Sequence, residues 1–213
     1  MASADSPDDR TIFIVDDDEA VRDSLALSLA TAGFRCETFA SGAELLGAVV
    51  GRIGCVLADV RMPGMDGLEL QRQLNTRGIG LPVIFMTGFG EVALAVQAMK
   101  AGAVDFVEKP CTLERLKDSL SRALARSETS QRAAAETAQA RERLSRLTPR
   151  ERDVLRLLVI GKPNKIIAHE LAISPRTVEI HRARVMDKVD VKSLSELVRL
   201  SLAAGEGEAT PAP

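Results

Sequence analysis

The sequence predicts an α/β domain with a doubly wound sheet of five parallel strands, followed by a small all-α domain of four helices. The first half alternates five short apolar segments with amphipathic helical patterns, which is typical of doubly wound sheets. The second half has helical patterns only. The charge changes with the pattern: residues 1–125 carry 12 Lys/Arg and 18 Asp/Glu, a net charge of −6, whereas residues 146–200 carry 12 and 7, a net charge of +5.

Five segments of the first half are predicted to be strands. TIFIV (11–15), GCVLADV (54–60) and PVIFMT (82–87) are apolar almost throughout, which is typical of strands buried on both faces of a parallel sheet. RCETF (35–39) and VDFVEK (104–109) complete the set. Helices are expected between the strands and after the last one. Their apolar stripes are Val21/Leu25/Leu29, Leu45/Leu46/Val49, Leu70/Leu74, Val92/Val96/Met99 and Leu113/Leu116/Leu120/Leu124.

Residues 126–143 are expected to form an exposed helical linker. The segment SETSQRAAAETAQARER keeps good helix formers but contains no large apolar residue, so it offers no stripe to a core. Two interpretations stay open, a simple spacer and a signal-transmitting coiled segment. The linker separates a first domain over residues 10–125 from a second over residues 144–205, and the tail at 206–213 is expected to be disordered.

Four helical segments are predicted in the second domain. The first opens with the capping box TPRE (148–151), and the last opens with SLSE (193–196). The two segments between them, 164–172 and 174–188, are joined by a short turn. These proportions are those of a helix-turn-helix.

The composition narrows the function classes. No apolar run approaches the roughly 20 residues that cross a bilayer, and the acidic N-terminus lacks the apolar stretch of a signal peptide. Cys36, Cys55 and Cys111 have no metal-ligand spacing. We interpret them as free thiols of a reducing compartment, the bacterial cytoplasm, with a redox-sensing role left open.

Chemically distinctive residues fall at predicted strand ends, where parallel α/β sheets bind their ligands. They are Asp16 with Asp17, Asp59, Thr87 and Lys109. Two carboxylates about 4 Å apart repel by roughly 4 kcal/mol at an effective dielectric of 20, and Mg²⁺ would offset this repulsion. A carboxylate held in this way can also attack a phosphoryl group. The neighbouring acids Asp18 and Glu19 are instead assigned to the positive end of the following helix.

The segments IVDDDE, LADVRMPGMDG, FMTG and AGAVDFVEKP, in this order and with these intervals, resemble the receiver domain of two-component response regulators. The resemblance covers residues 10–125. It implies that Asp59 accepts a phosphoryl group. It also implies that Mg²⁺ is bound by Asp16, Asp17, Asp59 and the backbone carbonyl of Arg61.

The same resemblance implies a conformational switch. Thr87 and Lys109 contact the phosphoryl group, and the proline that follows, Pro110, is cis. Phe106 occupies the position of the switch aromatic, which rotates inward when Thr87 moves toward the phosphoryl oxygen. The surface formed by residues 91–106 is thereby reshaped. Simple core packing of Phe106 is compatible with this role.

The segment 174–188 is the candidate DNA-reading helix. With Val178 on the core side, Val185 and Val189 share its inner face, and we interpret His181 as a packed core histidine. The opposite face combines small, apolar and basic residues, which suits a major groove, although a merely solvated face stays open. The expected contacts on this face are Arg176, Thr177, Glu179, Ile180, Ala183 and Arg184, and the expected phosphate contacts are Lys165, Arg182, Lys188 and Lys192.

The stretch that runs from LTPRERDVL through NKIIAHELAISPRTVEIHRARVMDKV to SLSELVRL resembles the LuxR-type DNA-binding domain, over residues 144 to 204. With the receiver, nearly the whole chain resembles FixJ-like regulators. The resemblance implies a phosphorylation-activated transcriptional regulator, and activation of its targets is the expected direction. Its implied partners are a sensor histidine kinase, double-stranded DNA with paired half-sites, RNA polymerase and a second copy of the chain. Glu179 replaces a residue that is often basic in relatives, so their target sequence is not transferred.

Two other function classes stay open from the sequence. A phosphatase or mutase would need an acid/base beside the nucleophile and a substrate-binding cap. Val60 and Arg61 follow Asp59 and no cap is inserted, so we expect slow self-dephosphorylation and no enzyme. A small-ligand-sensing regulator would share the DNA-binding module, but the first half lacks the aromatic pocket residues that such sensors generally use.

Overall fold

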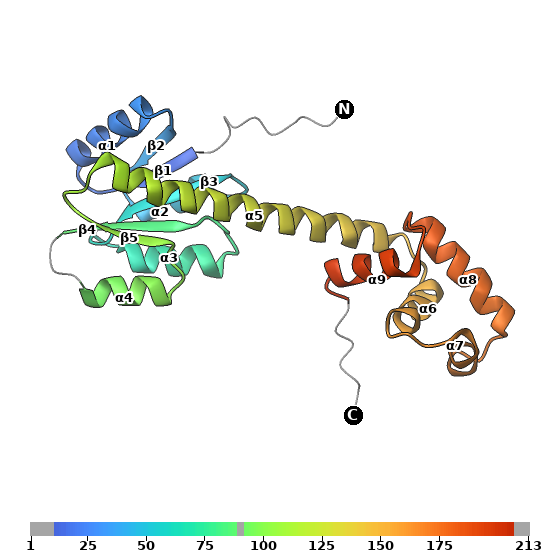
Figure 1. Cartoon of the computed structure of the whole chain (residues 1–213). Helices are drawn as coiled ribbons and strands as arrows, with labels where there is room; N and C mark the ends of the chain where they lie inside the picture. The colour runs from blue at the N-terminus through green and yellow to red at the C-terminus, as the bar shows by residue number, and fades with distance from the viewer. Residues whose placement is uncertain (1–10, 89–91, 207–213) are drawn as a thin grey trace. The chain divides into compact units, whose positions relative to one another are not determined.

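The computed structural model describes residues 11–88 and 92–206 and divides the chain into two compact units between Gln131 and Arg132 (Figure 1). The expected start of the first domain at residue 10 and the tail at 207–213 lie outside the described residues. Within these ranges, no helix is both long enough and apolar enough to cross a membrane. Each unit has its own hydrophobic core.

The first unit contains a five-stranded parallel sheet in the order β2-β1-β3-β4-β5, which confirms the predicted doubly wound fold. β1 and β4 are buried along their whole length, as their continuous apolar sequences predict, whereas the edge strand β2 is partly exposed. The strands are β1 (Thr11–Val15), β2 (Arg35–Phe39), β3 (Gly54–Asp59), β4 (Val83–Thr87) and β5 (Asp105–Glu108).

Helices cover both faces of this sheet (Figure 1). Phe13 and Val15 belong to the core beneath α2, α3 and α4, while Ile12 and Ile14 belong to the core beneath α1 and α5. This alternation follows from the period of two along a strand. The helices are α1 (Glu19–Thr31), α2 (Gly42–Ala48), α3 (Gly67–Thr76), α4 (Val92–Lys100) and α5 (Leu113–Ser145).

The second unit contains the four predicted short helices. Thr148 caps the first of them with the expected capping box, and Ser174 and Ser193 cap the third and fourth. The helices are α6 (Pro149–Val159), α7 (Asn164–Glu170), α8 (Pro175–Lys188) and α9 (Leu194–Ala203).

The expected helical linker is part of α5 and is exposed over most of its length, but its two ends differ from the expectation. The helix runs through the whole of the segment 126–143, and both ends of that segment are packed: Ser127 and Ala140 are each 2% exposed. Ala140 and the following Leu144 belong to the core of the second unit. Serine and alanine reach close-packed positions without forming a large apolar stripe, so the sequence pattern did not reveal these contacts.

The three cysteines are free, as predicted. Burial raises the pKa of Cys55 to about 12 and also raises the pKa of Cys36 and Cys111. Because the thiolate is the reactive form, this environment disfavours thiol chemistry at all three positions.

Candidate functional site

Three charged side chains meet at the carboxyl edge of the sheet. Asp16 follows β1, Asp59 ends β3, and Lys109 follows β5. Nζ of Lys109 donates hydrogen bonds to Oδ2 of Asp16 at 2.7 Å and to Oδ1 of Asp59 at 2.6 Å. The structure therefore brings together three residues that the sequence selected from their strand-end positions.

This cluster is partly withdrawn from water. The side chain of Asp16 is 5% exposed, that of Asp59 is 14% exposed and that of Lys109 is 26% exposed. Burial alone would lower the pKa of Lys109, but its hydrogen bonds to the two carboxylates outweigh burial and raise that pKa. The ammonium group therefore stays charged and offsets the repulsion between the carboxylates.

Backbone groups orient the two carboxylates. The N–H of Arg61 donates to Oδ2 of Asp59 at 2.6 Å, and the N–H of Asp18 donates to Oδ1 of Asp16 at 3.0 Å. Helix α3 begins at Gly67 directly against the end of β3: a Cβ at this position would lie 2.6 Å from the carbonyl oxygen of Asp59. Only glycine permits so close an approach of the helix to the site.

The two acids that follow Asp16 have different environments. Asp17 is exposed. Asp18 is the N-cap of α1 and accepts a hydrogen bond from the N–H of Ala20 at 2.8 Å, which confirms its predicted structural role. Within residues 11–88 and 92–206, no three His, Cys, Asp or Glu side chains are grouped closely enough to hold a metal ion by themselves. Asp16 and Asp59 thus form a two-carboxylate site, which suits Mg²⁺, an ion that keeps several waters.

Thr87 and Phe106 lie next to this cluster. Thr87 ends β4 with 2% exposure, and its carbonyl accepts a hydrogen bond from the N–H of Lys109 at 2.7 Å. The peptide bond between Lys109 and Pro110 is cis. Phe106, which pairs with Phe85 across β4 and β5, is partly buried at the margin of the core beneath α4. Its side chain therefore packs against this core without being fully buried.

Helix α4 packs against β5 and presents apolar side chains to solvent. Val96 is 48% exposed and Met99 is 47% exposed. The sequence assigned both residues to a buried stripe, and their exposure is a difference from that expectation. Exposed apolar side chains of this kind are suited to a protein contact.

The inner and outer faces of α8 match the sequence assignment. Val178, Val185 and Val189 are fully buried, and His181 is partly buried, with an Nδ1 atom that has no hydrogen-bond partner among the described residues. Ile180 is 45% exposed on the opposite side. Arg176, Glu179, Ala183 and Arg184 are also exposed, and Thr177 and Arg182 are partly exposed.

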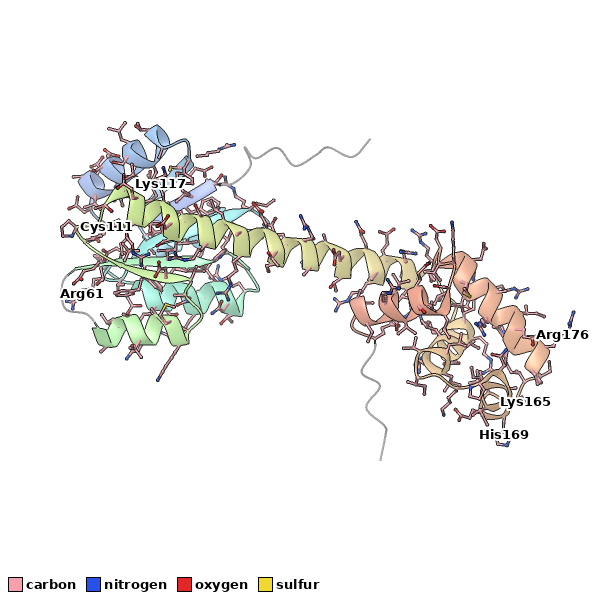
Figure 2. All side chains as sticks on the ribbon, viewed as in Figure 1. Arg61, Cys111, Lys117, Lys165, His169 and Arg176 are labelled. Carbon is pink, nitrogen blue, oxygen red and sulfur yellow. The ribbon has the colours of Figure 1, made fainter. Side chains whose placement is uncertain are left out.

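The predicted phosphate-binding lysines have different environments. Lys165 on α7 is exposed and lies at the same end of the second unit as His169 and Arg176 (Figure 2). Lys192 is exposed in the turn before α9. His169 was not among the predicted contacts, although it stands four residues after Lys165 and so shares its helix face.

Lys188 is engaged within the domain. Its Nζ donates a hydrogen bond to Oε2 of Glu151 at 2.7 Å, and Glu151 has a side-chain exposure of 4%. Burial alone would raise the pKa of Glu151, but the bonds from Lys188 and from the N–H of Thr148 lower it to about 2. The sequence did not predict this ion pair, because its partners are 37 residues apart.

A second ion cluster at the start of β5 was also missed. The Asp105 carboxylate accepts hydrogen bonds from Ser119 and Arg122, both at 2.5 Å, and pairs with Arg115 at 3.0 Å. Burial alone would raise the pKa of Asp105, but Ser119, the N–H of Phe106 and the two guanidinium groups lower it. Arg115, Ser119 and Arg122 are spaced by four and three residues, which would have placed them on one face of α5.

Two protein families match the chain. Residues 12–121 match the response regulator receiver domain, and residues 145–201 match the bacterial regulatory proteins of the luxR family. The transcriptional regulatory protein FixJ of Bradyrhizobium diazoefficiens is 46% identical over 195 residues, which cover 91% of this chain and 95% of that protein. The response regulator protein TodT of Pseudomonas putida is 40% identical over 191 residues, covering 89% of this chain and 84% of TodT.

Solved structures are similar over the same extent. The response regulator StyR aligns with a TM-score of 0.79 at 40% identity, covering 91% of this chain and 98% of StyR. Full-length FixJ from B. japonicum aligns with a TM-score of 0.56 at 46% identity, covering 92% of this chain and 97% of FixJ. Both alignments include the receiver-like and the helical parts.

Proposed function

The chain belongs to the FixJ-like two-component response regulators, in which a receiver domain precedes a LuxR-type DNA-binding domain, and from this premise we propose that Asp59 is its phosphorylation site. The protein is a phosphorylation-dependent regulator of transcription that acts on DNA and receives its signal from a sensor histidine kinase. We assign it to the cytoplasm, where these partners are accessible.

One observation carries the assignment of Asp59: Lys109 bridges its carboxylate to that of Asp16. A carboxylate oxygen of Asp59 attacks the phosphorus, and the histidine nitrogen of the kinase leaves. The Lys109 ammonium then faces the added negative charge, and the hydroxyl of Thr87 is the second proposed phosphoryl contact. Such transfer depends mainly on positioning and charge neutralisation, which these side chains supply.

Mg²⁺ is the proposed cofactor. Its proposed ligands are Asp16, Asp17, Asp59 and the backbone carbonyl of Arg61. Two carboxylates that share one ammonium group are close enough to share a divalent cation, which supports the assignment of Asp16 and Asp59. When bound, the ion would neutralise charge on the phosphoryl oxygens.

Phosphorylation is proposed to act on the surface of α4 and β5. Movement of Thr87 toward the phosphoryl group would make room for the ring of Phe106, which is only partly buried in this structure. The exposed Val96 and Met99 on the adjoining helix are the proposed contact with a second copy of the chain. A dimer would present two DNA-binding domains to paired half-sites.

The second unit is proposed to read DNA through α8. Ile180 and Ala183 would contact thymine methyl groups, and Arg176 would reach guanine or phosphate. Thr177, Glu179 and Arg184 lie beside them, and Lys165, Arg182 and Lys192 are the proposed phosphate contacts. Lys188 could contact a phosphate only if its ion pair with Glu151 were broken. RNA polymerase is the proposed target of the bound dimer, with activation as the expected result.

The decisive experiment is phosphorylation of the purified chain with acetyl phosphate and magnesium. We expect one phosphoryl group on wild-type protein and on the exposed-residue control Asp23→Asn, and none on Asp59→Asn. Analytical ultracentrifugation should then show dimers only for the two proteins that are modified. An unmodified residue 59 in folded wild-type protein would overturn the proposal.

Genome-wide mapping of bound DNA tests whether phosphorylation controls DNA binding by the second unit. The wild-type protein and Asp59→Asn should differ in the number of occupied promoters, since phosphorylation promotes DNA binding. Slow loss of the phosphoryl group in the absence of any partner is also expected. Rapid turnover of small phosphate monoesters would instead favour an enzyme.

A further inference from the structure

The last turns of α5 are part of the second unit. Ala140 and Leu144 are 2% and 1% exposed, and both belong to the core that contains Val178, Val185 and Val189 of the α8 segment. The luxR-family match begins only at residue 145. The packing therefore extends the DNA-binding unit toward the N-terminus, into a helix that precedes the matched residues.

Three arginine side chains connect this helix end to its neighbours through backbone carbonyls. Arg141 Nε donates to the carbonyl of Ala204 after α9 at 3.1 Å, and Arg152 of α6 donates to the carbonyl of Leu144 at 3.3 Å. The strongest connection is made by Arg143. Each of these carbonyls lies at the C-terminal end of a helix, where the macrodipole favours a cation.

Arg143 binds the C-terminus of the recognition helix α8. Its Nε donates to the carbonyl of Val189 at 2.8 Å. One of its terminal NH₂ groups donates to the same carbonyl and also to the carbonyl of Asp190, the latter at 2.5 Å. Asp190 has a positive φ of 51°, so the chain turns sharply away at this point. The guanidinium reaches these two carbonyls from two different nitrogens held in one plane, an arrangement that the single nitrogen of a lysine does not reproduce.

We propose that the DNA-binding module begins within α5, near Ala140, and that Arg143 is a positioning residue that fixes α8 by binding its C-terminal carbonyls. The inference rests on the proposed role of α8 in reading DNA. Loss of Arg143 should leave phosphate contacts in place but allow α8 to shift against α6. Affinity for a specific sequence should therefore fall more than affinity for unrelated DNA.

The test compares Arg143→Met with Arg146→Met in the full-length chain. Each variant loses one arginine in or just after the last turn of α5. Arg146 is half-exposed, and its ion pair among the described residues is with Glu142. After treatment with acetyl phosphate, each protein is titrated with two duplexes: the sequence that wild-type protein selects from a random library, and a scrambled duplex of equal length.

We expect Arg143→Met to lose about tenfold in affinity for the selected duplex, the size expected for lost charge-assisted hydrogen bonds, and to match Arg146→Met on the scrambled duplex. An equal loss on both duplexes, or no loss, overturns the proposal. If Arg143→Met does not fold, Arg143→Lys is compared with Arg146→Met instead, because lysine keeps the positive charge but lacks the planar set of N–H donors. A lower ratio of selected to scrambled affinity supports the proposal, and an unchanged ratio overturns it.

Amide hydrogen exchange gives a readout without DNA. In Arg143→Met, the amides of Val189 and Asp190 should exchange faster than in wild-type protein and in Arg146→Met, while amides of α6 keep their protection. Unchanged exchange at these two amides also overturns the proposal. Failure of the proposed function would appear differently, as a wild-type chain that is not phosphorylated or selects no sequence.

Discussion

The Lys109 side chain holds two carboxylates together, so its removal should be felt in stability. In Lys109→Met, Asp16 and Asp59 would face each other in a partly buried site without a cation. We expect the free energy of unfolding of the first unit to fall by about 2 kcal/mol without divalent ions, less than for a fully buried pair because Lys109 is partly exposed.

Adding magnesium to the same two proteins tests whether the carboxylates bind the ion. Because Mg²⁺ no longer competes with an ammonium group in Lys109→Met, millimolar magnesium should raise the thermal midpoint of the variant more than that of wild-type protein. Lys117→Met, which removes an exposed lysine of α5 (Figure 2), is the matched control and should behave like wild type. Calorimetry with and without magnesium measures both effects. If magnesium did not change the thermal midpoint of Lys109→Met, this would contradict magnesium binding at Asp16 and Asp59.

Glu151 gives the second unit a defined acid dependence. Its pKa is about 2 in the folded protein, against 4.5 for an unperturbed glutamate, so the folded state binds fewer protons. The stabilisation is complete above about pH 4.5 and is lost as the pH falls toward 2. It amounts to about 3 kcal/mol.

The substitution Glu151→Gln should remove that dependence. At neutral pH the variant should unfold more easily than wild type, because Lys188 loses its charged partner, and the difference should shrink as the pH falls from 4.5 to 2. Calorimetry of the second-unit transition across this range measures it. Glu142→Gln, at an exposed glutamate, should keep the wild-type acid profile. Parallel acid profiles of Glu151→Gln and wild type would exclude the ion pair as the cause.

Single residues were predictable where local sequence determines their place. Asp16, Asp59 and Lys109 follow recognisable strands, and parallel strands bring their carboxyl ends to one edge. Lys188 was not predictable in the same way. Its helical position indicated a surface lysine near DNA, but its actual partner, Glu151, comes from a helix far away in the sequence. A pairing of this kind depends on tertiary packing.

At the scale of elements, α5 is the informative case, because its two ends contribute to different cores. Leu120 is fully buried in the first unit, and Leu144 is 1% exposed in the second. Leu120→Ala should lower only the first calorimetric transition and Leu144→Ala only the second, each by about 2–5 kcal/mol. Ala134→Gly, between them, removes no buried side chain and should cost about 1 kcal/mol or less. If Leu144→Ala affected only the first transition, the extended DNA-binding unit would be wrong.

The strands and most helices could be predicted because their periodicity matches their burial. TIFIV and PVIFMT are continuous apolar runs and form strands buried on both faces. The linker could not be predicted fully. Its small residues provide no hydrophobic period, so the burial of Ser127 and Ala140 and the division at Gln131 follow from packing alone. Val96 and Met99 show the converse, since an apolar stripe does not guarantee burial.

At the scale of the whole molecule, the charge distribution assigns the partners. Residues 1–125 carry a net charge of −6, with 12 basic and 18 acidic residues, and residues 146–200 carry +5, with 12 and 7. Attraction to DNA is therefore confined to the second half. The acidic half contains the proposed phosphorylation site, and the negative charge added there would not favour DNA directly. Regulation of DNA binding must then act through conformation or dimerisation rather than through net charge.

The salt dependence of DNA binding separates the lysines that contact phosphate from those that only support the fold. Each neutralised phosphate contributes about −0.9 to the slope of log affinity against log salt concentration. Lys165→Gln should therefore flatten the slope by about 0.9 per bound chain, because Lys165 is exposed and is a proposed phosphate contact. Lys188→Gln should leave the slope unchanged and lower stability instead, because its ammonium is bound to Glu151. Titrations of the phosphorylated proteins at several salt concentrations measure both slopes.

Equal flattening of the slope by the two substitutions would mean that Lys188 exchanges Glu151 for a phosphate when DNA binds. The C-terminal end of α8 would then be held by fewer contacts in the complex than in the free protein.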